Sequence, residues 1–176
     1  MINEPLVAAA PTSGRNVVRD QPLVRRASVH QTLWPKSPPP TVRSAVAKTQ
    51  RWPLSTPGEI TWLRMHLRDH ILPSTGQAQT HEDDLDRLLL AFEELASNGL
   101  RHGRAPVAIA LHMTAEGWLI DVVDAATDRG PIPAVDRDPA HGGLGLHLVA
   151  RLCAAHGWFI DTQGKHVWAY IVRRSP

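Results

Sequence analysis

Apolar residues recur at helical spacing in three segments of the chain. The first covers residues 57–71 and ends before Pro73, because proline cannot continue a helix. The second covers residues 81–103 and opens with several acids, which suit the positive end of a helix dipole. The third covers residues 144–155. We therefore predict three helices, of which the second is the longest.

Five shorter segments have the alternating or continuous apolar pattern of strands. We expect an edge strand over Gln50–Ser55, a hairpin of Val107–Met113 and Trp118–Asp124, and a final hairpin of Trp158–Thr162 and His166–Val172. With the three helices, these strands predict an α/β (α+β) fold. In it, a mostly antiparallel mixed sheet forms one layer of a two-layer sandwich, and the helices cover one face.

The first 50 residues differ from the rest of the chain. They show little periodicity and include Pro38-Pro39-Pro40, so we interpret residues 1–50 as a disordered, Pro-rich basic tail before a domain at 51–176. An over-long start-site assignment is the alternative. The first 51 residues hold eight basic and two acidic residues, whereas the remainder holds 11 and 15. The folded domain is therefore mildly acidic, which argues against direct nucleic-acid binding by it.

Bulk properties favour a cytoplasmic protein that does not enter a membrane. No apolar run approaches the roughly 20 residues of a transmembrane helix, and the N-terminal region lacks a signal-peptide pattern. The single cysteine, Cys153, lies in the apolar run of the third predicted helix. We interpret it as a core-packing residue and not as a nucleophile.

The second predicted helix carries the first candidate for chemistry. Glu94 and Asn98 are four residues apart and therefore share a helix face, and Arg101 and His102 follow them. A carboxylate beside a carboxamide oxygen suits a hard cation such as Mg²⁺. The plain alternative is a solvated pair on a surface helix.

A glycine cluster opens the third predicted helix. Free backbone N–H groups at a glycine-rich helix start can bind phosphate, and a flexible turn is the alternative. The long segment 125–140 before the cluster is typical of a lid or a binding loop. A metal-binding helix and a phosphate-binding turn together outline a nucleotide site. The cluster consists of Gly142, Gly143, Leu144, Gly145 and Leu146.

The order of these motifs resembles the nucleotide-binding domain of the GHKL superfamily, which includes gyrase and the histidine kinases. The likeness is greatest to the anti-sigma-factor serine kinases of the RsbW and SpoIIAB type, and it covers residues 51–174. It implies a Bergerat-type ATP-binding fold. By this resemblance, Asn98 would coordinate Mg²⁺, Glu94 would be the general base, and Arg101 and His102 would border the nucleotide.

The resemblance also assigns the base and phosphate ends of the site. Asp124, which ends a predicted strand, would accept a hydrogen bond from the adenine amino group, and residues 142–146 would close on the phosphates. The family's usual Asp-x-Gly is Asp124-Ala125-Ala126 here. Asp121 is the competing acid of this strand, as Glu93 is for Glu94. We interpret Lys165, in the last hairpin, as structural or solvated.

The function implied is that of an ATP- and Mg²⁺-dependent protein serine/threonine kinase. It would bind a sigma factor, phosphorylate a serine of a STAS-class antagonist, and so switch partners, with a homodimer as its plausible assembly. The rival is a non-catalytic module that regulates by docking, which the missing glycine after Asp124 favours. A third possibility is the detached catalytic domain of a histidine kinase.

Overall fold

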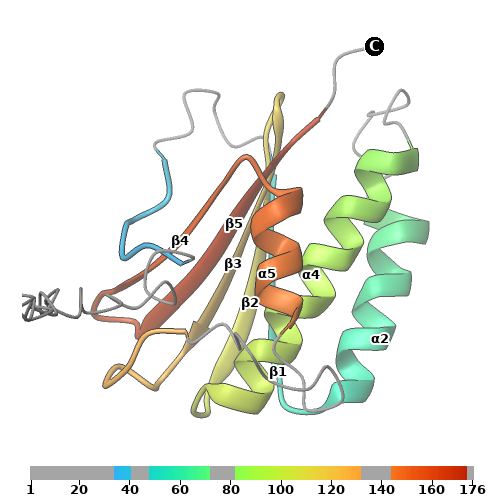
Figure 1. Cartoon of the computed structure of the whole chain (residues 1–176). Coiled ribbons are helices and arrows are strands. Elements are labelled where there is room, and N and C mark those ends of the chain that lie inside the picture. Colours follow the sequence, from blue (N-terminus) through green and yellow to red (C-terminus); the bar gives the residue numbers. More distant parts are fainter. Residues whose placement is uncertain (1–33, 41–47, 72–81, 132–143, 174–176) are drawn as a thin grey trace, which may run out of the picture.

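The computed structural model describes residues 34–40, 48–71, 82–131 and 144–173. These residues form five strands, three α-helices and one π-helical turn (Figure 1). In chain order they are β1 (Lys48–Leu54), α2 (Pro57–His66), η1 (Leu67–Ile71), α4 (Glu82–His102), β2 (Val107–Met113), β3 (Gly117–Asp124), α5 (Leu144–Leu152), β4 (Ala155–Ile160) and β5 (Lys165–Val172).

The five strands form one open sheet in the order β1-β2-β3-β5-β4, and the helices pack side by side on one of its faces (Figure 1). The predicted two-layer α/β architecture is confirmed. Every pairing between the named strands is antiparallel, and a single parallel bridge joins Lys36 to Trp158 of β4. Among the described residues, no helix is long and apolar enough to cross a membrane.

The core lies between the sheet and the apolar stripe of α4. Leu88, Phe92 and Leu95 of this helix are fully buried, as are Trp118 and Ile120 of β3. Burying each side chain of this size contributes about 1.5–3 kcal/mol, so this layer contact is a major source of stability. The predicted second helix thus buries its apolar stripe against the sheet.

The first predicted helix is divided in the structure. It is α-helical as far as His66 and continues as the π-helical turn η1. Its start is held by Glu59, whose carboxylate accepts hydrogen bonds from the backbone N–H of Ser55 at 2.6 Å and of Thr56 at 3.0 Å. These backbone donors lower the pKa of Glu59. The start of this helix is therefore set by contacts between residues that are close together in the sequence.

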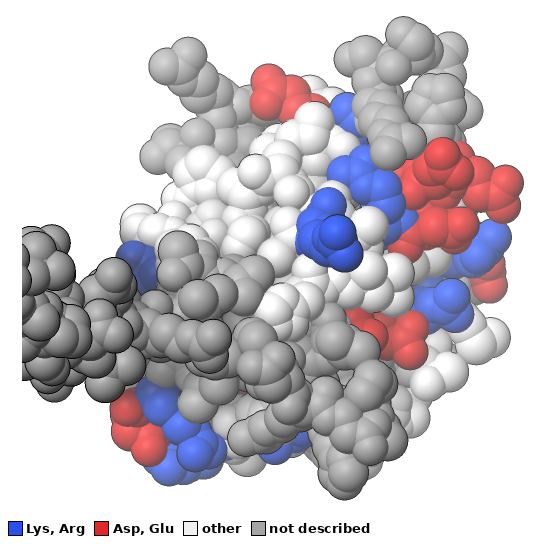
Figure 2. Space-filling view, in the orientation of Figure 1, with Lys and Arg blue, Asp and Glu red and all other residues white. Residues whose placement is uncertain are grey.

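Charged side chains of both signs meet where the first helical segment packs beside α4 (Figure 2). Arg64 pairs with Glu93 at 3.3 Å, and Arg68 lies 3.6 Å from Glu82 and 3.9 Å from Asp86. All these side chains are substantially exposed. Such pairs contribute little to stability, and they leave a mixed surface on this side of the described domain.

The prediction that the chain is disordered up to residue 50 is wrong for residues 34–40 and for residues 48–50, which begin β1. Trp34 is 2% exposed, and its Nε1 donates to the Gly157 carbonyl at 3.0 Å. The Ser37 N–H donates to Trp158, whose N–H donates to Pro35. A buried indole and backbone hydrogen bonds to the edge strand β4 hold this segment, whereas local periodicity reveals neither.

The third predicted helix ends three residues early. Arg87 of α4 donates through its Nη2 to the Leu152 carbonyl at 2.7 Å, and its Nη1 is held by buried Asp84 at 2.9 Å. The Ala154 N–H then bonds to the Tyr170 carbonyl, which brings the chain into β4. The apolar run through Cys153 predicts a longer helix because this capping arginine lies 65 residues away.

Candidate functional site

The last two turns of α4 line an open pocket with polar side chains. Glu94, Asn98 and Arg101 of α4 line one side of the pocket. The start of the neighbouring helix α5 lines the other side. Segments about 50 residues apart in the sequence therefore meet, as the candidate residues require. The complete lining is Glu94, Ser97, Asn98, Arg101, His102, Gly145 and Leu146.

Gly145 lies so close to Glu94 that a side chain at position 145 would force the carboxylate to move. A Cβ atom placed on Gly145 would overlap Oε2 of Glu94 and lie 2.7 Å from its Cδ. The carboxylate thus lies against the first turn of α5, where free N–H groups and the helix dipole favour a negative charge. The small size of Gly145 therefore lets the Glu94 carboxylate keep this position.

Of the two neighbouring glutamates, Glu94 is the one that lines the pocket. Burial raises its pKa, the adjacent Glu93 raises it further, and Arg101 partly opposes both effects. Glu93 is exposed and paired with Arg64 on the other side of the helix. The pocket therefore contains Glu94, and its raised pKa suits this carboxylate to accept a proton.

Asn98 is suited to hold a cation only in combination with other ligands. The described residues contain no group of three His, Cys, Asp or Glu side chains that could bind a metal ion. Magnesium usually keeps several waters and takes few protein ligands when phosphates supply the rest. The carboxamide of Asn98 fits such a role, and the α5 end fits phosphate.

The glycine cluster is only partly described. Gly142 and Gly143 lie outside the described residues, as does most of the segment 125–140. Leu144 begins α5, and Leu146 is buried in the core. Among the cluster's described residues, Gly145 and Leu146 line the pocket.

Asp124 is enclosed at the other end of the predicted site. Its Oδ1 accepts from the backbone N–H of Ala126 at 2.7 Å and of Arg104 at 3.4 Å. Its Oδ2 lies 3.1 Å from the Nζ atom of Lys165. The carboxylate is 2% exposed and the lysine side chain 4%, so the pair is buried. Both oxygens of the predicted base-binding carboxylate are thus in contact with donors of the chain itself.

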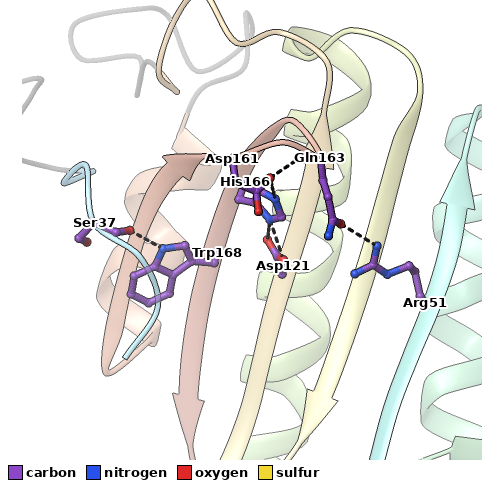
Figure 3. A network of polar contacts seen from close by, with 7 residues as sticks. All are labelled: Ser37, Arg51, Asp121, Asp161, Gln163, His166 and Trp168. Atoms are coloured by element: carbon purple, nitrogen blue, oxygen red, sulfur yellow. Dashed lines mark hydrogen bonds and ion pairs between the residues drawn. The ribbon is translucent and has the colours of Figure 1, made fainter. Parts of the chain in front are cut away.

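The rival acid Asp121 faces the opposite side of the sheet. Its carboxylate receives His166 Nδ1 at 2.9 Å, while His166 Nε2 lies 3.0 Å from Asp161 (Figure 3). Burial opposes protonation of His166, but both carboxylates together raise its pKa. This network lies away from the helices, near the contacts of Gln163 with Arg51 (Figure 3). Asp121 is therefore separate from the α4 pocket.

Two residues of the site were not assigned from the sequence. Ser97 lines the pocket, and Lys165 pairs with Asp124. Ser97 is three residues after Glu94 and could have been found from this helical spacing. Lys165 could have been found only from the register of β3 and β5, which places it opposite Asp124.

The single cysteine lies outside the pocket and has an unreactive thiol. Cys153 follows α5, packs against the core, and burial raises its pKa to about 11. Its thiol stays protonated near neutral pH, as expected for a packing residue.

Comparison with known proteins gives one family and a matching fold. The sequence model of the histidine kinase-like ATPase domain matches residues 57–171. The crystal structure of the RsbU and RsbW domains of Rv1364c from Mycobacterium tuberculosis superposes with a TM-score of 0.50 at 15% identity. The match covers 73% of this chain and 34% of that chain, about a third of its length. No curated protein sequence matches.

Proposed function

Because this chain belongs to the histidine kinase-like ATPase domain family, we propose that it binds ATP with Mg²⁺ and is a protein serine/threonine kinase of the anti-sigma-factor type. The observation that carries the proposal is the pocket in which Glu94 and Asn98 of α4 meet Gly145 at the start of α5. By resemblance its partners are a sigma factor and a STAS-class antagonist, with a homodimer as the working assembly, in the cytoplasm.

Each pocket residue has a distinct part in this proposal. Asn98 contributes a neutral oxygen to the cation, and the α5 N-terminus and Arg101 stabilise negative charge in the pocket. The bound nucleotide supplies the phosphoryl group, and its metal ion neutralises charge during transfer. Glu94 accepts the proton of the attacking serine hydroxyl, a role to which its raised pKa is suited.

The proposal is tested by incubating the purified full chain with Mg²⁺-ATP and a candidate STAS antagonist. Phosphoserine on the antagonist is the expected product, and Glu94→Gln should abolish transfer while retaining nucleotide binding. Glu93→Gln is the matched control, since this neighbouring glutamate pairs with Arg64 outside the pocket. Equal transfer by the Glu94→Gln and wild-type proteins would remove the base from the proposal.

A second candidate function is favoured by the buried Asp124–Lys165 pair. A domain whose base-binding acid is occupied could regulate a partner by docking alone, with weak nucleotide binding or none. Tight association with a sigma factor or antagonist, unaffected by ATP and by Asn98→Ala, would support this docking module. Phosphate found on a histidine would instead indicate a histidine kinase fragment.

A further inference from the structure

We infer that Lys165 sets the nucleotide affinity and base selectivity of this chain, because its ammonium takes the hydrogen-bonding position at Asp124 that an adenine amino group would need. The inference rests on the proposed function and specifies how its pocket treats the base. The arrangement makes the base end of the site self-occluded, while the phosphate end stays open.

Both carboxylate oxygens of Asp124 are already in contact with donors of the chain itself. Two backbone N–H groups share Oδ1, and the Lys165 ammonium lies 3.1 Å from Oδ2. Both side chains are almost completely buried. A ligand amino group would therefore have to open this buried contact and compete with the ammonium for Oδ2.

The exchange is unfavourable on chemical grounds. An ammonium–carboxylate contact is charge-assisted and stronger than a hydrogen bond from a neutral amino group. Removing the lysine from Asp124 would also leave two buried charges without their partners. A neutral base therefore cannot compete well for this position.

The backbone around the pair fixes it in place. Asp124 and Lys165 are direct cross-strand neighbours in the register of β3 and β5. Gly164 precedes the lysine with a φ of 143°, a conformation that favours glycine, and an added Cβ there would lie 2.5 Å from the Asp124 carbonyl oxygen. On the other side, a Cβ on Gly103 would lie 2.7 Å from the Asp124 Cγ. The enclosure thus comes from tight turns and strand register.

The test compares ATP with inosine triphosphate, which carries a carbonyl oxygen where ATP carries the amino group. Calorimetric titration of the full-length protein with Mg²⁺ is expected to give wild-type Kd values for the two ligands within about twofold. In Lys165→Met, the ATP Kd should fall at least about tenfold while the inosine triphosphate Kd stays unchanged.

Two further variants separate occlusion from structure. Lys165→Arg keeps the positive charge and should bind both ligands as the wild type does. Lys165→Met combined with Asp124→Ala removes the acceptor, so the gain for ATP should disappear. Thermal unfolding followed by circular dichroism establishes that each variant is folded. The comparison of ATP with inosine triphosphate in the wild-type protein does not depend on the folding of any variant.

The outcomes distinguish this inference from the proposed function. Preference of the wild type for ATP over inosine triphosphate by about tenfold or more would overturn the role of Lys165 and leave ATP binding intact. Equal ATP affinity in wild type and folded Lys165→Met would do the same. Absence of nucleotide binding in both proteins would overturn the inference and the proposed function together.

Discussion

The two ends of the candidate site lie in one domain but differ in how their polar groups are satisfied. In the pocket between α4 and α5, Glu94 and Asn98 border an open space. At the end of β3, Asp124 is buried and its oxygens are taken by Lys165 and two backbone donors. A residue that matches a family motif by position can therefore be available for a ligand at one end of a site and committed to the fold at the other.

The buried pair at the closed end should give the largest effect. Lys165→Met or Asp124→Ala alone leaves an unpaired buried charge, which costs about 3–5 kcal/mol, measurable by urea unfolding. The double variant should recover most of this loss. By contrast, Glu93→Gln in the exposed pair with Arg64 should cost less than about 1 kcal/mol. Similar small costs for both pairs would show that the Asp124 end is accessible to water.

Gly145 offers a way to disturb the open end alone. Gly145→Ala places a methyl group on the Glu94 carboxylate, which must move aside, so we expect a cost of about 1 kcal/mol or less in unfolding free energy. Adding Glu94→Ala should relieve the overlap. The double-mutant cycle therefore measures this contact, and strict additivity of the two substitutions would contradict it.

Asn98 tests ligand binding at the open end directly. Asn98→Ala should weaken Mg²⁺-ATP binding by about tenfold or more, about 1.4 kcal/mol, because the cation loses an oxygen ligand. Its unfolding free energy should change little, since the side chain is only partly buried at the pocket wall. Calorimetric titration measures the first quantity, with Glu93→Gln as control. Unchanged affinity would place the cation elsewhere.

The raised pKa of Glu94 predicts a small pH effect, below about 1 kcal/mol because the group is partly exposed. Its folded-state pKa lies above the ordinary value of 4.5, so the folded chain retains this proton longer than the unfolded chain. Stability from this group is complete below that value and is lost as the pH rises through the folded-state pKa. Relative to wild type, Glu94→Gln should therefore gain stability across this interval, measured by urea unfolding at successive pH values.

Much of the helical layer could be predicted from local pattern. The stripe of α4 follows from residues three and four apart, and the same spacing places Glu94 and Asn98 on one face. The hairpin of β2 and β3 follows from two apolar runs around a short turn. Local pattern did not predict the π-helical turn η1. It also did not predict the early end of α5, because that end depends on Arg87, which lies far away in the sequence.

The sequence by itself determined which residues share a helix face, where the strands begin and end within a few positions, and that Gly145 opens a helix. Tertiary structure decided that Trp34 packs under the edge of the sheet and that Asp124 faces Lys165, 41 residues later. The physical reason is that helical spacing acts within one or two turns, whereas cross-strand register and burial depend on contacts between distant segments. Whether a motif residue is open or committed is settled by those distant contacts.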